Sequence, residues 1–100
     1  MNVGEWGATI NVATGFNMSA ATLLQLQFLM PGYITKTVTA TLGITTFTDP
    51  SGNVFTANNY VFYKTIAGDI AAAGNWQVKV LYTDAVQYLP STYVAFTVGA

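Results

Sequence analysis

An alternation of apolar and polar residues runs through most of this chain and constrains its fold more than any other feature. Between residues 21 and 30, Leu24, Leu26, Phe28 and Met30 occupy every second position. Side chains two residues apart point to the same side of a β-strand, so this spacing predicts a strand with one face in a core.

The same alternation predicts further strands, several of them rich in threonine and valine, which suit a pleated and half-buried surface. The expected strands cover residues 7–13, 35–47, 60–65, 76–82 and 93–98. With the strand at 21–30 they give six or seven short strands in 100 residues, and residues 83–92, which include Pro90, are expected to form a loop. A parallel βαβ fold would need long helical crossovers, so we predict an all-β, two-sheet antiparallel sandwich forming one domain over residues 1–100.

Two segments between these strands carry turn signals. Asp49-Pro50-Ser51-Gly52-Asn53 combines a turn-opening acid, a proline with preset φ and a flexible glycine, which predicts a tight hairpin or corner. Its alternate oxygen ligands also allow a calcium loop, but a plain turn is favoured because no bidentate glutamate follows. Asp69 precedes Ile70–Ala73 and Gly74, which predicts one short helical turn near residues 70–73 capped by Asp69.

Asp69, Gly74 and Trp76 also stand in the order found before the penultimate strand of immunoglobulin (Ig)-like sandwiches. There an aromatic residue anchors the corner that leads into the strand. We therefore expect the Trp76 ring in the core and its indole N–H bonded to a backbone carbonyl. The sequence has no cysteine, so an Ig-like sandwich here depends on packing alone.

The composition closes most catalytic possibilities. Cysteine, histidine and arginine are absent, which removes thiolate and imidazole chemistry, and charged residues make up 7% of the chain. The four carboxylates are far apart in sequence, so we expect no carboxylate pair, no metal site and no cofactor site. They are Glu5, Asp49, Asp69 and Asp84. The chain is predicted not to be an enzyme.

Three lysines and a net charge of −1 cannot form the basic surface that a nucleic acid requires, so no nucleic-acid partner is expected. The longest apolar stretch, residues 20–30, contains Thr22, Gln25 and Gln27 and falls short of the roughly 20 residues that span a membrane. We expect no membrane insertion. Residues 1–5 also lack the pattern of a signal peptide, which predicts synthesis in a cytoplasm.

Tyrosine and tryptophan are frequent, a composition shared by sugar-binding faces and protein interfaces. About half of these rings are expected in the core or on sheet faces. Trp6, Tyr33 and Tyr88 are the candidate interface residues, the two tyrosines because they fall in predicted loops.

Turns and core positions along nearly the whole chain carry a family resemblance. They are Val3-Gly4-Glu5, Gly7–Ile10, Thr14–Thr22, Met30-Pro31-Gly32, Ala67–Ile70, Ala73–Val78 and Phe96-Thr97-Val98. With these features the chain resembles small Ig-like virion structural proteins of tailed bacteriophages, which are similar to the N-terminal domain of phage baseplate upper proteins.

The resemblance implies a virion component, such as a capsid decoration, neck, tail or baseplate module, made in the host cytoplasm and packed in many copies against other virion proteins. It brings no catalytic residues with it. A second interpretation stays open, in which the chain is an Ig-like binding module that contacts a host-surface carbohydrate or receptor. An exposed coplanar row of aromatic rings would favour sugar binding, whereas apolar edge strands would favour the structural role.

Overall fold

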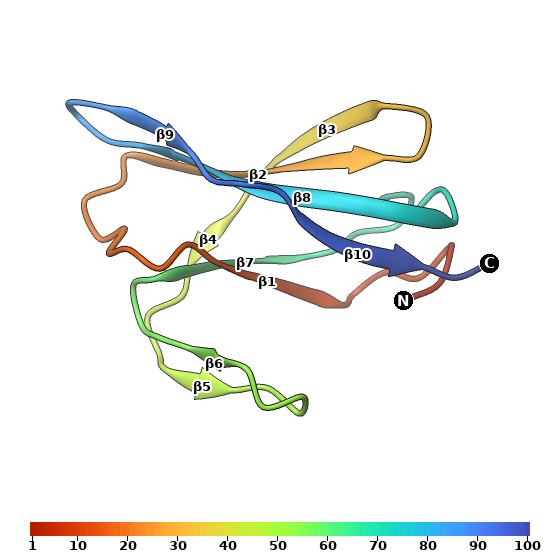
Figure 1. The fold of residues 1–100 in the computed structure, drawn as a ribbon, viewed down its shortest axis with the longest axis horizontal. Helices are drawn as coiled ribbons and strands as arrows, with labels where there is room; N and C mark the ends of the chain where they lie inside the picture. The colour runs from red at the N-terminus through yellow and green to blue at the C-terminus, as the bar shows by residue number, and fades with distance from the viewer.

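Two antiparallel β-sheets face each other in the computed structural model, which describes residues 1–100 (Figure 1). The smaller sheet has the strand order β1 (Thr9–Ala13), β7 (Tyr60–Lys64) and β4 (Thr41–Leu42). The larger has the order β10 (Val94–Val98), β8 (Gly74–Thr83), β2 (Leu23–Met30) and β3 (Ile34–Thr39), and β9 (Tyr88–Pro90) also pairs with β8. The predicted all-β antiparallel sandwich is confirmed, with ten strands instead of six or seven.

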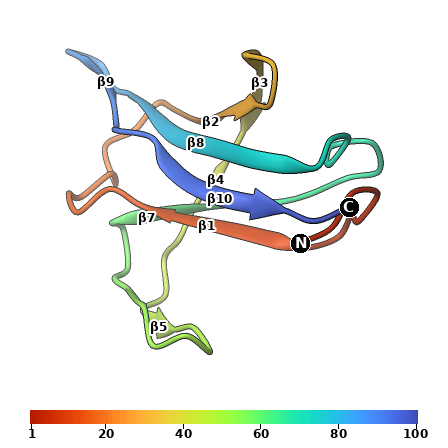
Figure 2. The ribbon, with the colours of Figure 1, turned by 45° about the vertical axis from the view of Figure 1, so that its right-hand side comes forward.

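The strand order is that of an Ig-like sandwich. Such folds pair strands B, E and D in one sheet and G, F and C in the other, with C′ beside C. Strands β1, β7 and β4 take the first three places, and β10, β8, β2 and β3 take the other four. The segment before β1 contributes no first strand, only an isolated parallel bridge between Asn2 and Gly99. The edges of β1 and β10 therefore lie uncovered beside each other, as Figure 2 shows.

The core lies between the sheets and follows the alternation seen in the sequence. Leu24, Leu26 and Phe28 of β2 are buried, and in the neighbouring β8 every second residue from position 76 to 82 is buried. The intervening glutamines of β2 are half-buried on the opposite face of the sheet. The alternation therefore correctly predicted which face of each central strand packs in the core.

The prediction of a single strand over residues 35–47 is wrong, because the chain passes from the larger sheet to the smaller one within this segment. The Ala40 N–H donates to the Leu24 carbonyl at 2.9 Å in the larger sheet, whereas Thr41 already pairs with Phe62 in the smaller one. The alternation continues through this crossing because Val38, Ala40 and Leu42 all face the same core. Strand β4 ends at Leu42 and is followed by Gly43, where an added Cβ would clash with the Tyr60 ring.

A separate hairpin of β5 (Phe47–Thr48) and β6 (Val54–Phe55) projects from the sandwich next to the smaller sheet (Figure 1). The predicted turn at 49–53 joins its strands. Asp49 fixes this turn, since one carboxylate oxygen accepts hydrogen bonds from Ser51 N–H at 3.0 Å and Asn53 N–H at 2.9 Å. The Phe47 and Phe55 rings stack at 5.1 Å and both pack edge-on against Tyr60.

Two local predictions are wrong. Residues 70–73 form no helical turn, because the carbonyls that a helix would use are bonded elsewhere: Ile70 to Gly4 N–H at 2.9 Å and Ala72 to the Trp76 indole at 2.9 Å. Residues 83–92 are not all loop, since β9 pairs with the end of β8. Pro90 is accommodated there because β9 is an edge strand, where a missing N–H can face solvent.

Candidate interaction surface

Two of the four carboxylates stabilise turns of the chain through hydrogen bonds to main-chain N–H groups. Asp49 binds its own turn, and Asp84 accepts hydrogen bonds from Val86 N–H at 2.8 Å and Gln87 N–H at 2.9 Å. No three carboxylate, histidine or cysteine side chains gather where a metal ion could be held. The structure also contains no helix long and apolar enough to span a membrane.

Trp76 anchors the corner where the chain enters β8, as predicted. Its side chain is 1% exposed, and its indole N–H donates to the Ala72 carbonyl at 2.9 Å. The ring packs against Phe28 at 6.2 Å and Phe96 at 5.8 Å between centroids. This bond to the backbone four residues upstream corresponds to the aromatic corner of Ig-like folds.

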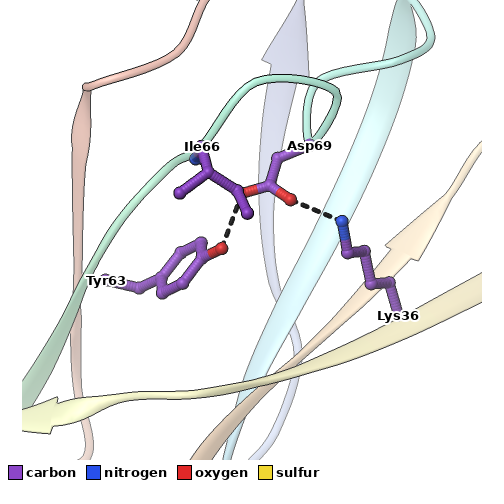
Figure 3. A network of polar contacts seen from close by, with 4 residues as sticks. All are labelled: Lys36, Tyr63, Ile66 and Asp69. Atoms are coloured by element: carbon purple, nitrogen blue, oxygen red, sulfur yellow. Dashed lines mark hydrogen bonds and ion pairs between the residues drawn. The ribbon is translucent and has the colours of Figure 1, made fainter.

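Asp69 joins the two sheets through a partly buried polar network instead of capping a helix (Figure 3). One carboxylate oxygen forms an ion pair with Lys36 of β3, in the larger sheet. The other accepts a hydrogen bond from the Tyr63 hydroxyl of β7 at 2.6 Å and one from Ile66 N–H at 2.8 Å. A single carboxylate thus ties an edge strand of the larger sheet to the centre of the smaller one.

The charged and polar groups of this network are bonded to one another. Burial opposes ionisation of Asp69, but the hydrogen bonds from Lys36, Tyr63 and Ile66 outweigh it and hold the carboxyl pKa below its ordinary value of 3.8. Burial and the neighbouring carboxylate together raise the pKa of Tyr63 to about 12. Each polar group has its partner within the chain, so we assign the cluster a structural role.

The predicted interface residues are exposed but lie apart. Tyr33 is 91% exposed at the tip of the β2–β3 hairpin, Tyr88 is 56% exposed in β9, and Trp6 is 67% exposed before β1. The turn between β2 and β3 and the strand β9 lie at opposite ends of the larger sheet (Figure 1), so Tyr33 and Tyr88 belong to separate parts of the surface. Their role in an interface stays a prediction.

Tyr33 has an additional feature, because its φ of 61° lies in the left-handed region that bulky side chains rarely adopt. The preceding Gly32, with φ 88°, shares this turn. Beside Tyr33 a surface hollow of about 360 Å³ is lined by residues that include Asn75 and Gln77. Backbone strain that holds an aromatic ring in solvent is a feature associated with contact sites.

A larger surface lies on the uncovered side of the sandwich, and sequence reasoning missed it. A groove of about 700 Å³ runs between β1, β10 and the projecting hairpin. Its apolar lining includes Ile10, Val12, Val54, Val94 and Phe96. These residues are distant in sequence, and they meet here because no first strand covers the edges of β1 and β10.

Comparison with protein-family models, curated proteins and solved structures finds no match for this chain. The features of this chain that bear on its function are those of its own surface: an uncovered sheet edge, an apolar groove and few charges.

Proposed function

We propose that this chain is a non-enzymatic structural subunit of a tailed-bacteriophage virion that acts by packing against other protein chains. The observation that carries the proposal is the uncovered side of the sandwich, where two strand edges flank an apolar groove of about 700 Å³. Exposed apolar surface next to free strand edges is typical of a protein surface that becomes buried against another chain in an assembly.

The charge distribution supports packing over catalysis. Among the residues that line the groove, Asp49 is the one with a charged side chain, and it is bonded to its own turn. Elsewhere Asp69 is neutralised by Lys36 inside the fold. Few charges remain for electrostatic recognition, so apolar and main-chain contacts supply the binding energy.

The virion context of this proposal comes from the sequence resemblance to small Ig-like phage proteins, which implies a capsid decoration, neck, tail or baseplate module. The fold agrees with the Ig-like part of that resemblance.

Mass spectrometry of purified particles of the phage that encodes the chain tests this proposal. We expect the chain in the particle, in a copy number that matches a symmetric ring, tube or shell. Its absence from particles that contain the other virion proteins would contradict the virion role.

One observation favours a second function, recognition of a host-surface glycan. The exposed Tyr33 lines a surface hollow together with Asn75 and Gln77, and an aromatic residue beside amide-bearing residues suits a sugar. Glycan-array binding that is lost in Tyr33→Ala and kept in Tyr88→Ala would favour this function over packing alone.

A further inference from the structure

We propose that two copies of this chain pair through the free edge of β1, antiparallel and about a two-fold axis at Asn11. The inference rests on the proposed packing function and names its surface and partner. In the pair, the two smaller sheets become one continuous sheet of six strands.

The hydrogen bonds of β1 leave one set of main-chain groups free. Thr14 N–H donates to the Asn59 carbonyl at 2.9 Å, and Thr65 N–H donates to the Ala8 carbonyl at 2.9 Å. Bonded pairs alternate along an antiparallel ladder, so even-numbered residues of β1 bond to β7. The N–H and C=O groups of Thr9, Asn11 and Ala13 therefore point away from β7.

Strands β3, β9 and β4 carry features that oppose pairing at their edges, whereas β1 does not. Strand β3 holds the inward-pointing Lys36, β9 contains Pro90, and β4 has two residues. Just beyond the end of β10, at Gly99, the N-terminal segment already occupies this edge, because Val3 N–H donates to the Gly99 carbonyl at 2.9 Å. Strand β1 contains no charge, proline or glycine, the usual protections of an exposed edge.

The β1 edge is complementary to itself. With Asn11 on a two-fold axis, Asn11 faces Asn11 of the second copy and Thr9 faces Ala13, and all three positions present free main-chain groups. An isologous contact of this kind closes on itself, as most homodimers do. The uncharged edge and nearly uncharged groove match an uncharged partner surface, which the second copy presents.

The groove supplies area that strand pairing lacks. A stable homodimer covers about 800 Å² of each partner, about a seventh of the 5725 Å² accessible surface of this chain. Two five-residue strands cover less than that. Val54 and Val94, both exposed, and the half-buried Phe96 border the same groove and extend the contact.

Analytical ultracentrifugation of the purified chain from about 1 µM to about 1 mM tests the pairing. The unmodified chain is expected to dimerise with increasing concentration. Asn11→Pro removes an N–H that β7 does not use and should weaken the dimer at least about tenfold. The matched control is Thr37→Pro on the edge of β3. The bond from Ala40 N–H to the Leu24 carbonyl shows that the main-chain groups of odd-numbered β3 residues are likewise free of β2, so this variant should dimerise normally.

A charge exchange at the axis tests the register and remains decisive if the proline variant fails to fold. Asn11→Lys and Asn11→Asp should each be monomeric, because residue 11 then faces a like charge, and an equimolar mixture should form a heterodimer. A mixture that stays monomeric, or a dimer that persists in Asn11→Lys, overturns the β1 pairing. A monomeric unmodified chain that is nevertheless present in particles overturns this pairing and leaves the virion role standing.

Discussion

Two residues close the end of the sandwich where β7 leads into β8. Trp76 fills the core at this corner and bonds the backbone upstream, while Asp69 ties Lys36 and Tyr63 together from opposite sheets. One acts mainly through apolar area and the other through charge and hydrogen bonding. Their substitutions are therefore expected to respond differently to pH.

Trp76→Ala is expected to lower the free energy of unfolding by about 3–5 kcal/mol, because it empties a large, fully buried aromatic site. Urea denaturation followed by far-ultraviolet circular dichroism measures the change. Trp6→Ala is the matched control, since that indole is 67% exposed, and should change stability by less than about 0.5 kcal/mol. A loss below about 1 kcal/mol for Trp76→Ala would contradict the buried corner.

Asp69→Asn is expected to cost about 1–3 kcal/mol at pH 7, because the ion pair and one acceptor are lost while Lys36 and Tyr63 remain. The pKa of Asp69 is lower in the folded state than its ordinary value of 3.8. Its contribution to the free energy of unfolding is therefore complete above about pH 3.8 and is lost as the pH falls through the lower folded-state pKa. The difference in free energy of unfolding between the variant and the unmodified chain should decrease below pH 3.8. Glu5→Gln, at an exposed carboxylate, serves as the control. A difference that stays constant down to pH 2 would contradict the network.

At the level of elements, the β5–β6 hairpin depends on its own aromatic cluster. Its two-residue strands are too short to be stable alone, so Phe47, Phe55 and Tyr60 must hold it to the sandwich. The Tyr60 hydroxyl also donates to the Thr45 carbonyl at 2.7 Å. The hairpin is thus a small unit whose side-chain contacts with the sandwich are centred on Tyr60.

Phe47→Ala is expected to speed amide hydrogen exchange at residues 44–57 and to leave exchange in β2 and β8 unchanged, because the hairpin can open without the core. Hydrogen exchange read by mass spectrometry measures both regions in one sample. Equal acceleration in β2 and β8 would show that the hairpin and core unfold together.

The sequence predicted those parts of the fold that depend on neighbouring residues. The alternation around Leu26 and Val80 revealed the buried faces, and the pattern before Trp76 revealed the corner. The crossing at Ala40 was missed because the alternation passes through it unbroken. The role of Asp69 was missed because its ion-pair partner, Lys36, lies 33 residues away. The groove also joins segments distant in sequence, and no local pattern marks it.

At the scale of the whole molecule, the fold leaves one side open. The missing first strand uncovers β1 and β10, and the hairpin extends the same side into a groove with an apolar lining. The chain has 7% charged residues, and part of that charge is used inside the fold. Contacts made on this surface are expected to be insensitive to ionic strength, because apolar burial and main-chain hydrogen bonds carry them.

Washing purified particles at low and high sodium chloride, with the chain followed by gel electrophoresis, tests whether apolar and main-chain contacts hold this chain in the virion. Raising the salt from about 0.1 M to about 1 M shortens the screening length from about 10 Å to about 3 Å and weakens contacts between charges. We expect the chain to stay on the particle in both washes. Release in high salt, or no chain on particles in either wash, would contradict it.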